Sequence, residues 1–270
     1  MREFSNSLKM TKMLCILGLL NACSPGSQNK NLLLLPSSPS SQIINGIDLE
    51  DGAVPAQSSV LLVNPVSEMV CTAILLNESF ALTAAHCLDL ENPENHYIFF
   101  GTRPTNTAPR RQVVAARAPR YWGAQDPDGK NSGDIAIIKF ESGPLPEGFR
   151  AAKFLKDASL LKAGQTTLVL GYGVTNPNSF AGVGQLRAAT MPILDVQYSA
   201  TEILLDQTKG SRVCYGDSGG PAFVRIQNTY YLWGLATRGV GNEDEACSSA
   251  VAFTNVLIYS TWIQRVLNKL

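Results

Sequence analysis

Residues 214–221 read Cys-Tyr-Gly-Asp-Ser-Gly-Gly-Pro and set one serine, Ser218, among glycines. Two earlier segments belong with this one: Leu-Thr-Ala-Ala-His-Cys at 82–87 and Gly-Asp-Ile-Ala-Ile-Ile-Lys at 133–139. A histidine, an aspartate and a serine therefore follow one another, each in a short segment of its own. Each segment alone is a weak signal, because Gly-Asp-Ser-Gly resembles any polar turn. Together, in a chain with only two histidines, they decide how the rest is interpreted.

These three side chains have the chemistry of an activated nucleophile. A serine hydroxyl is a poor nucleophile until a neighbouring base removes its proton, and histidine is suited to that task. A carboxylate on the far imidazole nitrogen fixes the tautomer and stabilises the imidazolium. We therefore predict Ser218 as nucleophile, His86 as general base and Asp134 as orienting acid. The backbone N–H groups of Gly216 and Ser218 are expected to donate to a developing oxyanion.

The surrounding sequence has the pattern of an all-β protein. Short apolar stretches rich in β-branched and aromatic residues alternate with Gly, Pro, Asn and Asp. The predicted strands are 59–63, 71–75, 98–101, 112–116, 134–140, 166–171, 221–225, 230–236 and 251–255. Only residues 257–270 predict a helix, because their apolar residues form a single stripe. The second histidine, His96, follows a polar loop and is interpreted as a surface residue.

From Ile43 to Leu270 the chain resembles the chymotrypsin/trypsin family of serine proteases. The three ordered segments carry the resemblance, supported by Ile-Ile-Asn-Gly at 43–46, Gly-Tyr-Gly at 171–173 and the C-terminal helix. It implies two six-stranded antiparallel β-barrels with the catalytic residues in the cleft between them, followed by a C-terminal α-helix. It also implies a serine endopeptidase that acts on protein or peptide substrates, as a monomer.

The same resemblance implies the cysteine pairing. Of the six cysteines, Cys71 would pair with Cys87 beside the histidine, and Cys214 with Cys247 at the walls of the specificity pocket. Four paired cysteines suit an oxidising compartment. Thr237 falls where the family usually has a serine that supports the buried aspartate, so a hydroxyl is kept.

The family resemblance also implies that the chain is made as an inactive precursor, a zymogen. Cleavage before Ile43 would free an α-amine that pairs with the aspartate preceding the nucleophile, here Asp217, and so shapes the oxyanion-binding turn. Gln42 precedes that bond instead of Arg or Lys. Another protease, or a different kind of self-cleavage, is therefore expected to activate the chain.

The specificity pocket departs from that of a trypsin. Arg212 stands at the floor position, where trypsins carry Asp, and Val213 follows it; Gly239 and Val251 are the expected walls. Like charges in a desolvated pocket argue against cleavage after Arg or Lys. Two alternatives remain. Arg212 points into the pocket and favours acidic substrates, or Val251 closes the floor and admits only small apolar side chains. The acidic run 243–245 is interpreted as solvated, with pairing to Arg212 as the alternative.

The N-terminal residues predict an exported precursor. A basic pair precedes an apolar run, 13–20, that is too short to span a membrane. The sequence Leu-Asn-Ala-Cys at 20–23 resembles the lipobox of bacterial lipoproteins. We therefore predict a lipoprotein-type signal peptide at 1–22, a lipidated Cys23, a Ser/Pro-rich tether at 23–42 and the peptidase domain at 43–270. The alternative is an ordinary secretory signal in which Cys23 is incidental.

The expected location is the periplasm or outer membrane, with membrane attachment only through Cys23 and release on cleavage before Ile43. A formal charge of zero without a concentrated basic face argues against nucleic acid. The sequence has no His/Cys cluster with metal spacing, so neither a metal nor a cofactor is expected. An activating protease is the expected partner besides substrates. The alternatives are a catalytically inactive surface-binding lipoprotein of the same fold, or an unrelated structural lipoprotein that would leave the ordered segments unexplained.

Overall fold

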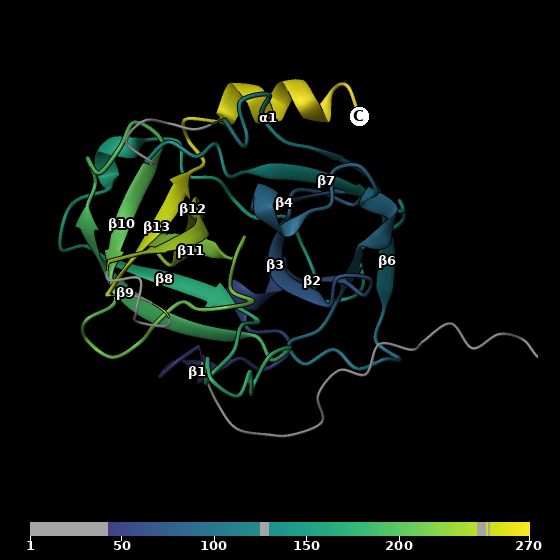
Figure 1. The fold of residues 1–270 in the computed structure, drawn as a ribbon, viewed down its shortest axis with the longest axis horizontal. Helices are drawn as coiled ribbons and strands as arrows, with labels where there is room; N and C mark the ends of the chain where they lie inside the picture. The colour runs from purple at the N-terminus through teal and green to yellow at the C-terminus, as the bar shows by residue number, and fades with distance from the viewer. Residues whose placement is uncertain (1–42, 125–129, 242–246, 248) are drawn as a thin grey trace, which may run out of the picture. The chain divides into compact units, whose positions relative to one another are not determined.

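Two antiparallel β-barrels make up the fold in the computed structural model, which describes residues 43–124, 130–241, 247 and 249–270. The first barrel closes in the order β2 (Ser59–Asn64), β3 (Met69–Leu75), β4 (Phe80–Thr83), β7 (Ala136–Phe140), β6 (Arg110–Arg117) and β5 (Tyr97–Phe99), and β5 pairs back onto β2. Figure 1 shows it on the right, beside the green and yellow strands of the second barrel.

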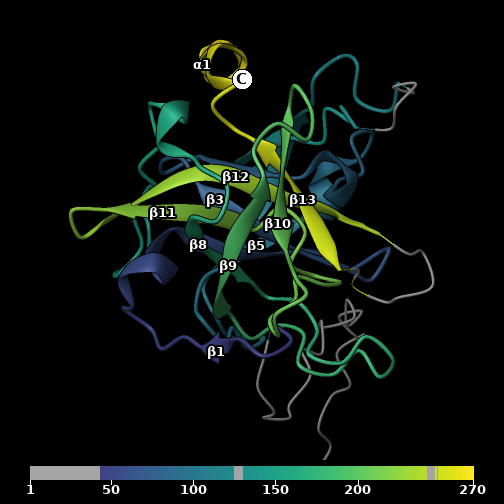
Figure 2. The ribbon, with the colours of Figure 1, turned by 90° about the vertical axis from the view of Figure 1, so that its left-hand side faces the viewer.

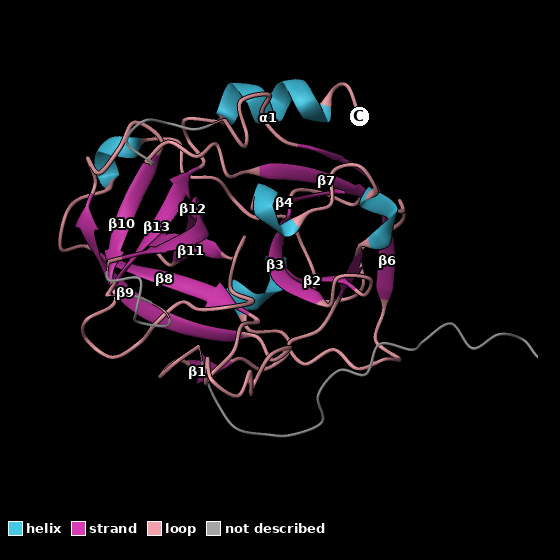
Figure 3. Cartoon of the chain, viewed as in Figure 1, coloured by secondary structure: helices cyan, strands magenta, loops and turns pink. Residues whose placement is uncertain are grey.

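The second barrel has the order β8 (Thr166–Gly171), β9 (Arg187–Asp195), β10 (Glu202–Asp206), β13 (Ala250–Asn255), β12 (Thr229–Val240) and β11 (Pro221–Ile226), and β11 pairs back onto β8. A two-residue strand, β1 (Ile47–Asp48), extends it beside β9. Short 3₁₀ turns lie at η1 (Val54–Ser58), η2 (Ala85–Cys87), η3 (Pro93–Asn95) and η4 (Ala158–Leu160), and the chain ends in α1 (Ser260–Leu267). Figure 3 shows how strands dominate both halves. The prediction of two six-stranded barrels and a C-terminal helix is confirmed.

Strand β2 shows how the alternating side chains build the core. Val60 and Leu62 belong to a cluster made only of first-barrel residues. Leu61 and Val63, which point the other way along the strand, belong to a cluster that also contains second-barrel residues and Ile263 of α1. A third cluster is formed mainly by the second barrel. The two barrels therefore share a buried apolar interface, and the helix, seen end-on in Figure 2, packs its apolar stripe against that interface.

All nine predicted strands are present, but β1, β4, β9 and β10 were not predicted. β1 and β4 are only two and four residues long. Strand β9 contains Pro192, and β10 reads Glu-Ile-Leu-Leu-Asp, so neither shows a clean alternation of polar and apolar residues. Within the described residues, no helix is long and apolar enough to cross a membrane.

Candidate active site

The three motif residues come from both barrels. His86 lies in η2, directly after β4, and Asp134 lies two residues before β7, so both belong to the first barrel. Ser218 lies in the loop that leads into β11 of the second barrel. His86 and Ser218 line the same cavity, whose volume is about 550 Å³. The fold thus brings together three side chains that are up to 132 residues apart in the sequence.

His86 is held by both oxygens of the Asp134 carboxylate. Its Nδ1 lies 2.7 Å from Oδ2, and its backbone N–H donates to Oδ1 at 3.0 Å. The Asp134 side chain is buried, whereas the imidazole is about one-third exposed. Because the carboxylate takes the Nδ1 side, the Nε2 side of the ring remains for a partner in the cavity.

The nucleophile turn is pinned to β3 by its carbonyl groups. Thr72 donates from its backbone N–H to the Ser218 carbonyl at 2.9 Å and from its hydroxyl to the Gly216 carbonyl at 3.0 Å. The N–H groups of Gly216 and Ser218, in contrast, donate to no other residue in the part of the chain that is described. At Gly219, where φ is +76°, an added Cβ would overlap the Thr83 hydroxyl and the Thr72 carbonyl. The turn therefore has two uncommitted N–H groups beside Ser218, as an oxyanion site requires.

Asp217, the expected partner of a freed Ile43, is fully buried beneath this turn. Its Oδ1 accepts the Gly173 N–H at 2.8 Å and its Oδ2 accepts the Cys214 N–H at 2.9 Å. Burial raises the pKa of Asp217 to about 7, while these two hydrogen bonds and the charge of Arg187 act in the opposite direction. Ile43 is itself fully buried, in the cluster of the second barrel.

Arg187 is a residue that the sequence analysis missed. It is 1% exposed, and its Nη1 donates to the carbonyls of Gly173 and Gly182 at 3.1 and 2.8 Å. Its Nε donates to Asp48 at 2.9 Å. It therefore holds the carbonyl of Gly173, the residue whose N–H binds Asp217. The sequence around Arg187 did not predict this role, because its partners Asp48 and Gly173 lie in other parts of the chain.

Three of the four predicted pocket residues line the cavity. The described lining residues are His86, Val213, Cys214, Tyr215, Ser218, Ala236, Thr237, Arg238, Gly239, Gly241, Cys247 and Val251. Arg212 is not among them; its backbone N–H donates to the Ile44 carbonyl at 2.9 Å in an isolated β-bridge. The structure therefore does not bring Arg212 to the pocket. The acidic run 243–245 lies outside the described residues.

Both implied disulfides are present. Cys71 is bonded to Cys87, which anchors the histidine turn to β3, and Cys214 is bonded to Cys247 beside the cavity. Cys71, His86 and Cys87 also lie close enough together to resemble a metal site among the described residues. Both sulfurs are consumed by the disulfide, however, so this group does not fit a metal.

Two expectations about single residues are corrected. Thr237 donates its hydroxyl to the Ala252 carbonyl at 2.9 Å; it is the Thr254 hydroxyl that reaches Asp134, at its backbone carbonyl, 3.0 Å away. The prediction that His96 lies on the surface is wrong, since it is 1% exposed. Its Nδ1 donates to the Pro93 carbonyl, and its Nε2 accepts from the Asp89 N–H and the Asn64 amide. Burial lowers the pKa of His96, which keeps the ring in the neutral form that this pattern needs.

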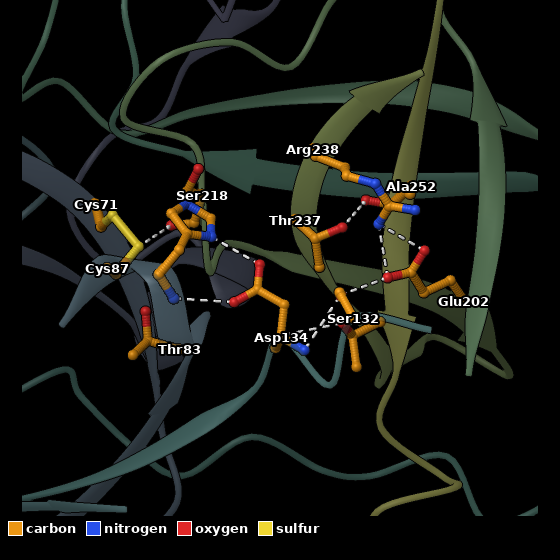
Figure 4. Close-up of polar contacts among 12 residues, drawn as sticks. Cys71, Thr83, Cys87, Ser132, Asp134, Glu202, Ser218, Thr237, Arg238 and Ala252 are labelled. Carbon is orange, nitrogen blue, oxygen red and sulfur yellow. Dashed lines mark hydrogen bonds and ion pairs between the residues drawn. A yellow bond between two sulfur atoms is a disulfide. The ribbon is translucent and has the colours of Figure 1, made fainter. Parts of the chain in front are cut away.

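An ion pair behind Asp134, between the buried carboxylate of Glu202 and the partly exposed guanidinium of Arg238, was also missed. Glu202, at the start of β10, binds the guanidinium of Arg238 and the hydroxyl of Ser132, as Figure 4 shows. The sequence signal was available, because Glu202 opens an apolar strand much as Asp134 does.

Two comparisons with known proteins found matches over most of the chain. Residues 43–263 match the family model described as Trypsin. A protein named Chymotrypsin, from Phaedon cochleariae, is 26% identical over 238 residues, which cover 84% of this chain and 82% of that protein. Neither comparison bears on the predicted lipobox at Cys23.

Proposed function

The chain belongs to the trypsin family of serine proteases, and on this premise we propose that it is an endopeptidase that hydrolyses peptide bonds through an acyl-enzyme on Ser218. One observation carries the proposal. The buried Asp134 carboxylate binds His86 with both oxygens, and the imidazole shares a cavity with Ser218 and its two uncommitted N–H groups.

In the proposed mechanism, His86 Nε2 removes the proton of the Ser218 hydroxyl as its oxygen attacks the substrate carbonyl carbon. The negative charge on the carbonyl oxygen is stabilised by the N–H groups of Gly216 and Ser218. His86 then gives the proton to the leaving amine as the C–N bond breaks. Water repeats the sequence on the acyl-enzyme and releases the acid. Asp134 remains ionised and holds the imidazole in the productive tautomer.

We propose that the residue before the cleaved bond is small and apolar. Val213, Ala236 and Val251 are buried residues that line the cavity. No carboxylate belongs to its described lining, so no residue of that described lining would pair with a basic side chain. Arg212 lies outside that lining, and the guanidinium of Arg238, which does line the cavity, is already bound to the Glu202 carboxylate. The main argument for acidic substrates is therefore removed. The inactive surface-binding alternative is not favoured, because no member of the expected constellation is missing.

Labelling by a fluorophosphonate probe tests the proposed nucleophile. The activated wild-type chain should be labelled and Ser218→Ala should not, whereas the matched control Ser142→Ala, an exposed serine, should be labelled like the wild type. A correctly processed sample without labelling would refute the proposal. Peptides varied at the residue before the cut then test specificity; a preference for Arg, Lys, Asp or Glu contradicts the apolar pocket.

We also propose export and an activating cleavage before Ile43, supported by the two disulfides and by the family. Residues 1–42, including the predicted signal and Cys23, lie outside the described residues. If Cys23 is lipidated, the same cleavage releases the enzyme from the membrane, because the paired cysteines all lie after residue 43. N-terminal sequencing of the active fraction tests this, and an active species that still begins at Cys23 would contradict it.

A further inference from the structure

A buried carboxylate lies behind Asp134, outside the proposed reaction. Glu202 is 1% exposed, so its charge needs compensation from within the protein. Arg238 supplies it: Nη1 lies 2.7 Å from both Oε1 and Oε2. The Ser132 hydroxyl donates to Oε1, also at 2.7 Å.

Ser132 passes this anchorage on to Asp134. Its hydroxyl oxygen, while donating to Glu202, accepts the backbone N–H of Asp134 at 3.3 Å. Figure 4 shows the resulting line from the Arg238 guanidinium through Glu202 and Ser132 to Asp134. Ser132 and Asp134 belong to the first barrel, whereas Glu202 and Arg238 lie on β10 and β12 of the second barrel. The link therefore crosses between the barrels.

Two neighbouring contacts also join the segment before Asp134 to the segment that leads into β10. The Thr201 hydroxyl donates to the Asn131 side chain at 3.1 Å, and the Lys130 ammonium lies 5.3 Å from the centre of the Tyr198 ring. The segment that ends at Asp134 is thus docked onto the start of β10 over three consecutive residues, and its most buried anchor is Glu202.

We propose that Ser132 and Glu202 are positioning residues, which hold Asp134, and through it His86, in register with Ser218 on the other barrel. The proposal rests on the function proposed above. Neither side chain lines the cavity, so neither is expected to contact substrate. Catalytic groups have to be held within about 0.5 Å of their productive geometry. Loss of the link should therefore lower turnover and leave substrate binding nearly unchanged.

The experiment compares Ser132→Ala with Ser132→Thr, which keeps the hydroxyl, and with Ser142→Ala as the surface control. Rates are divided by the active-site concentration, titrated with the fluorophosphonate. We expect Ser132→Ala to lose about five- to tenfold in kcat, as for one lost hydrogen bond, with KM within about twofold. Ser132→Thr and Ser142→Ala should retain kcat. Glu202→Gln should lose at least as much, and adding Ser132→Ala to it should cause little further loss, because the two act in series.

Each other outcome overturns the proposal. It is overturned if Ser132→Ala turns over like the wild type, if Thr fails to restore kcat, if the loss appears in KM, or if a lower titre or melting temperature accounts for it. These results are distinct from failure of the proposed function, in which the wild-type chain itself would not react with the probe.

Discussion

The hydrogen bonds of the Thr72 hydroxyl lead to a quantitative prediction about stability. The Thr72 hydroxyl is fully buried, donates to the Gly216 carbonyl at 3.0 Å and accepts the Tyr172 N–H at 3.1 Å. Thr72→Val keeps the shape and removes both bonds, which leaves a buried N–H and a carbonyl without their partner. At about 1–3 kcal/mol for each such group, the free energy of unfolding should fall by about 2–4 kcal/mol, since the two groups can relax in part.

The same substitution should lower kcat, because the Thr72 hydroxyl would no longer hold the Gly216 carbonyl, and the peptide between the two oxyanion donors would be less well fixed. Complete loss of one donor costs about 10²–10³ in kcat; a loosened donor should cost about tenfold. Urea unfolding in a Ser218→Ala background, which prevents self-digestion, measures the stability, and titrated kcat measures the chemistry. Thr72→Ser is the matched control, since it keeps the hydroxyl and should keep kcat. Wild-type kcat in Thr72→Val, or equal losses in Thr72→Ser, would refute the argument.

Three further predictions follow from single contacts. Gly219→Ala should unfold at a much lower urea concentration than Gly52→Ala, because both positions have positive φ but only at Gly219 does the Cβ meet other atoms; equal midpoints would contradict this. In the uncut Ser218→Ala chain, the pKa of Asp217 is raised from 3.8 to about 7, so its contribution to stability is complete below pH 3.8 and is lost as the pH rises through 7. Urea midpoints from pH 5 to 8 should show this loss in that chain but not after Asp217→Asn; parallel profiles would count against it. Val251→Gly should shift the preferred residue before the cut from Ala or Val towards Leu or Phe. Val251 on β13 pairs with Gly239 on the neighbouring strand β12 and lines the cavity, so loss of its side chain enlarges the space for the substrate. An unchanged ranking of kcat/KM would show that Val251 does not limit the pocket.

Local signals in the sequence predicted an all-β chain and the residues proposed to react, whereas the two barrels followed from the family resemblance. Each proposed catalytic residue lies in a short segment, and the three segments are informative together. The apolar strands between them are bounded by turn residues. The structure then places His86 against Asp134 and in one cavity with Ser218. The disulfide partners followed from the family pattern alone.

The parts that the sequence did not predict depend on contacts between distant residues. His96 looked exposed because its neighbours are polar, but its donors come from Asn64, 32 residues earlier, and from the Asp89 backbone. Arg212 was assigned to the pocket by position, whereas its backbone pairs with Ile44 at the other end of the domain. The partners of Glu202 lie 70 residues before it and 36 after it. No periodicity or spacing rule encodes such pairs.

The division of the site between two barrels has a consequence for how such a chain can be recombined. Each barrel has a core cluster of its own, so a half taken from another family member could in principle form its own strands. The alignment of His86 with Ser218 belongs to neither half. It depends on side-chain pairs that join the two barrels, such as Ser132 with Glu202 and Asn131 with Thr201. A hybrid of two active parents is therefore expected to fold and yet turn over slowly, until both members of each pair come from the same parent.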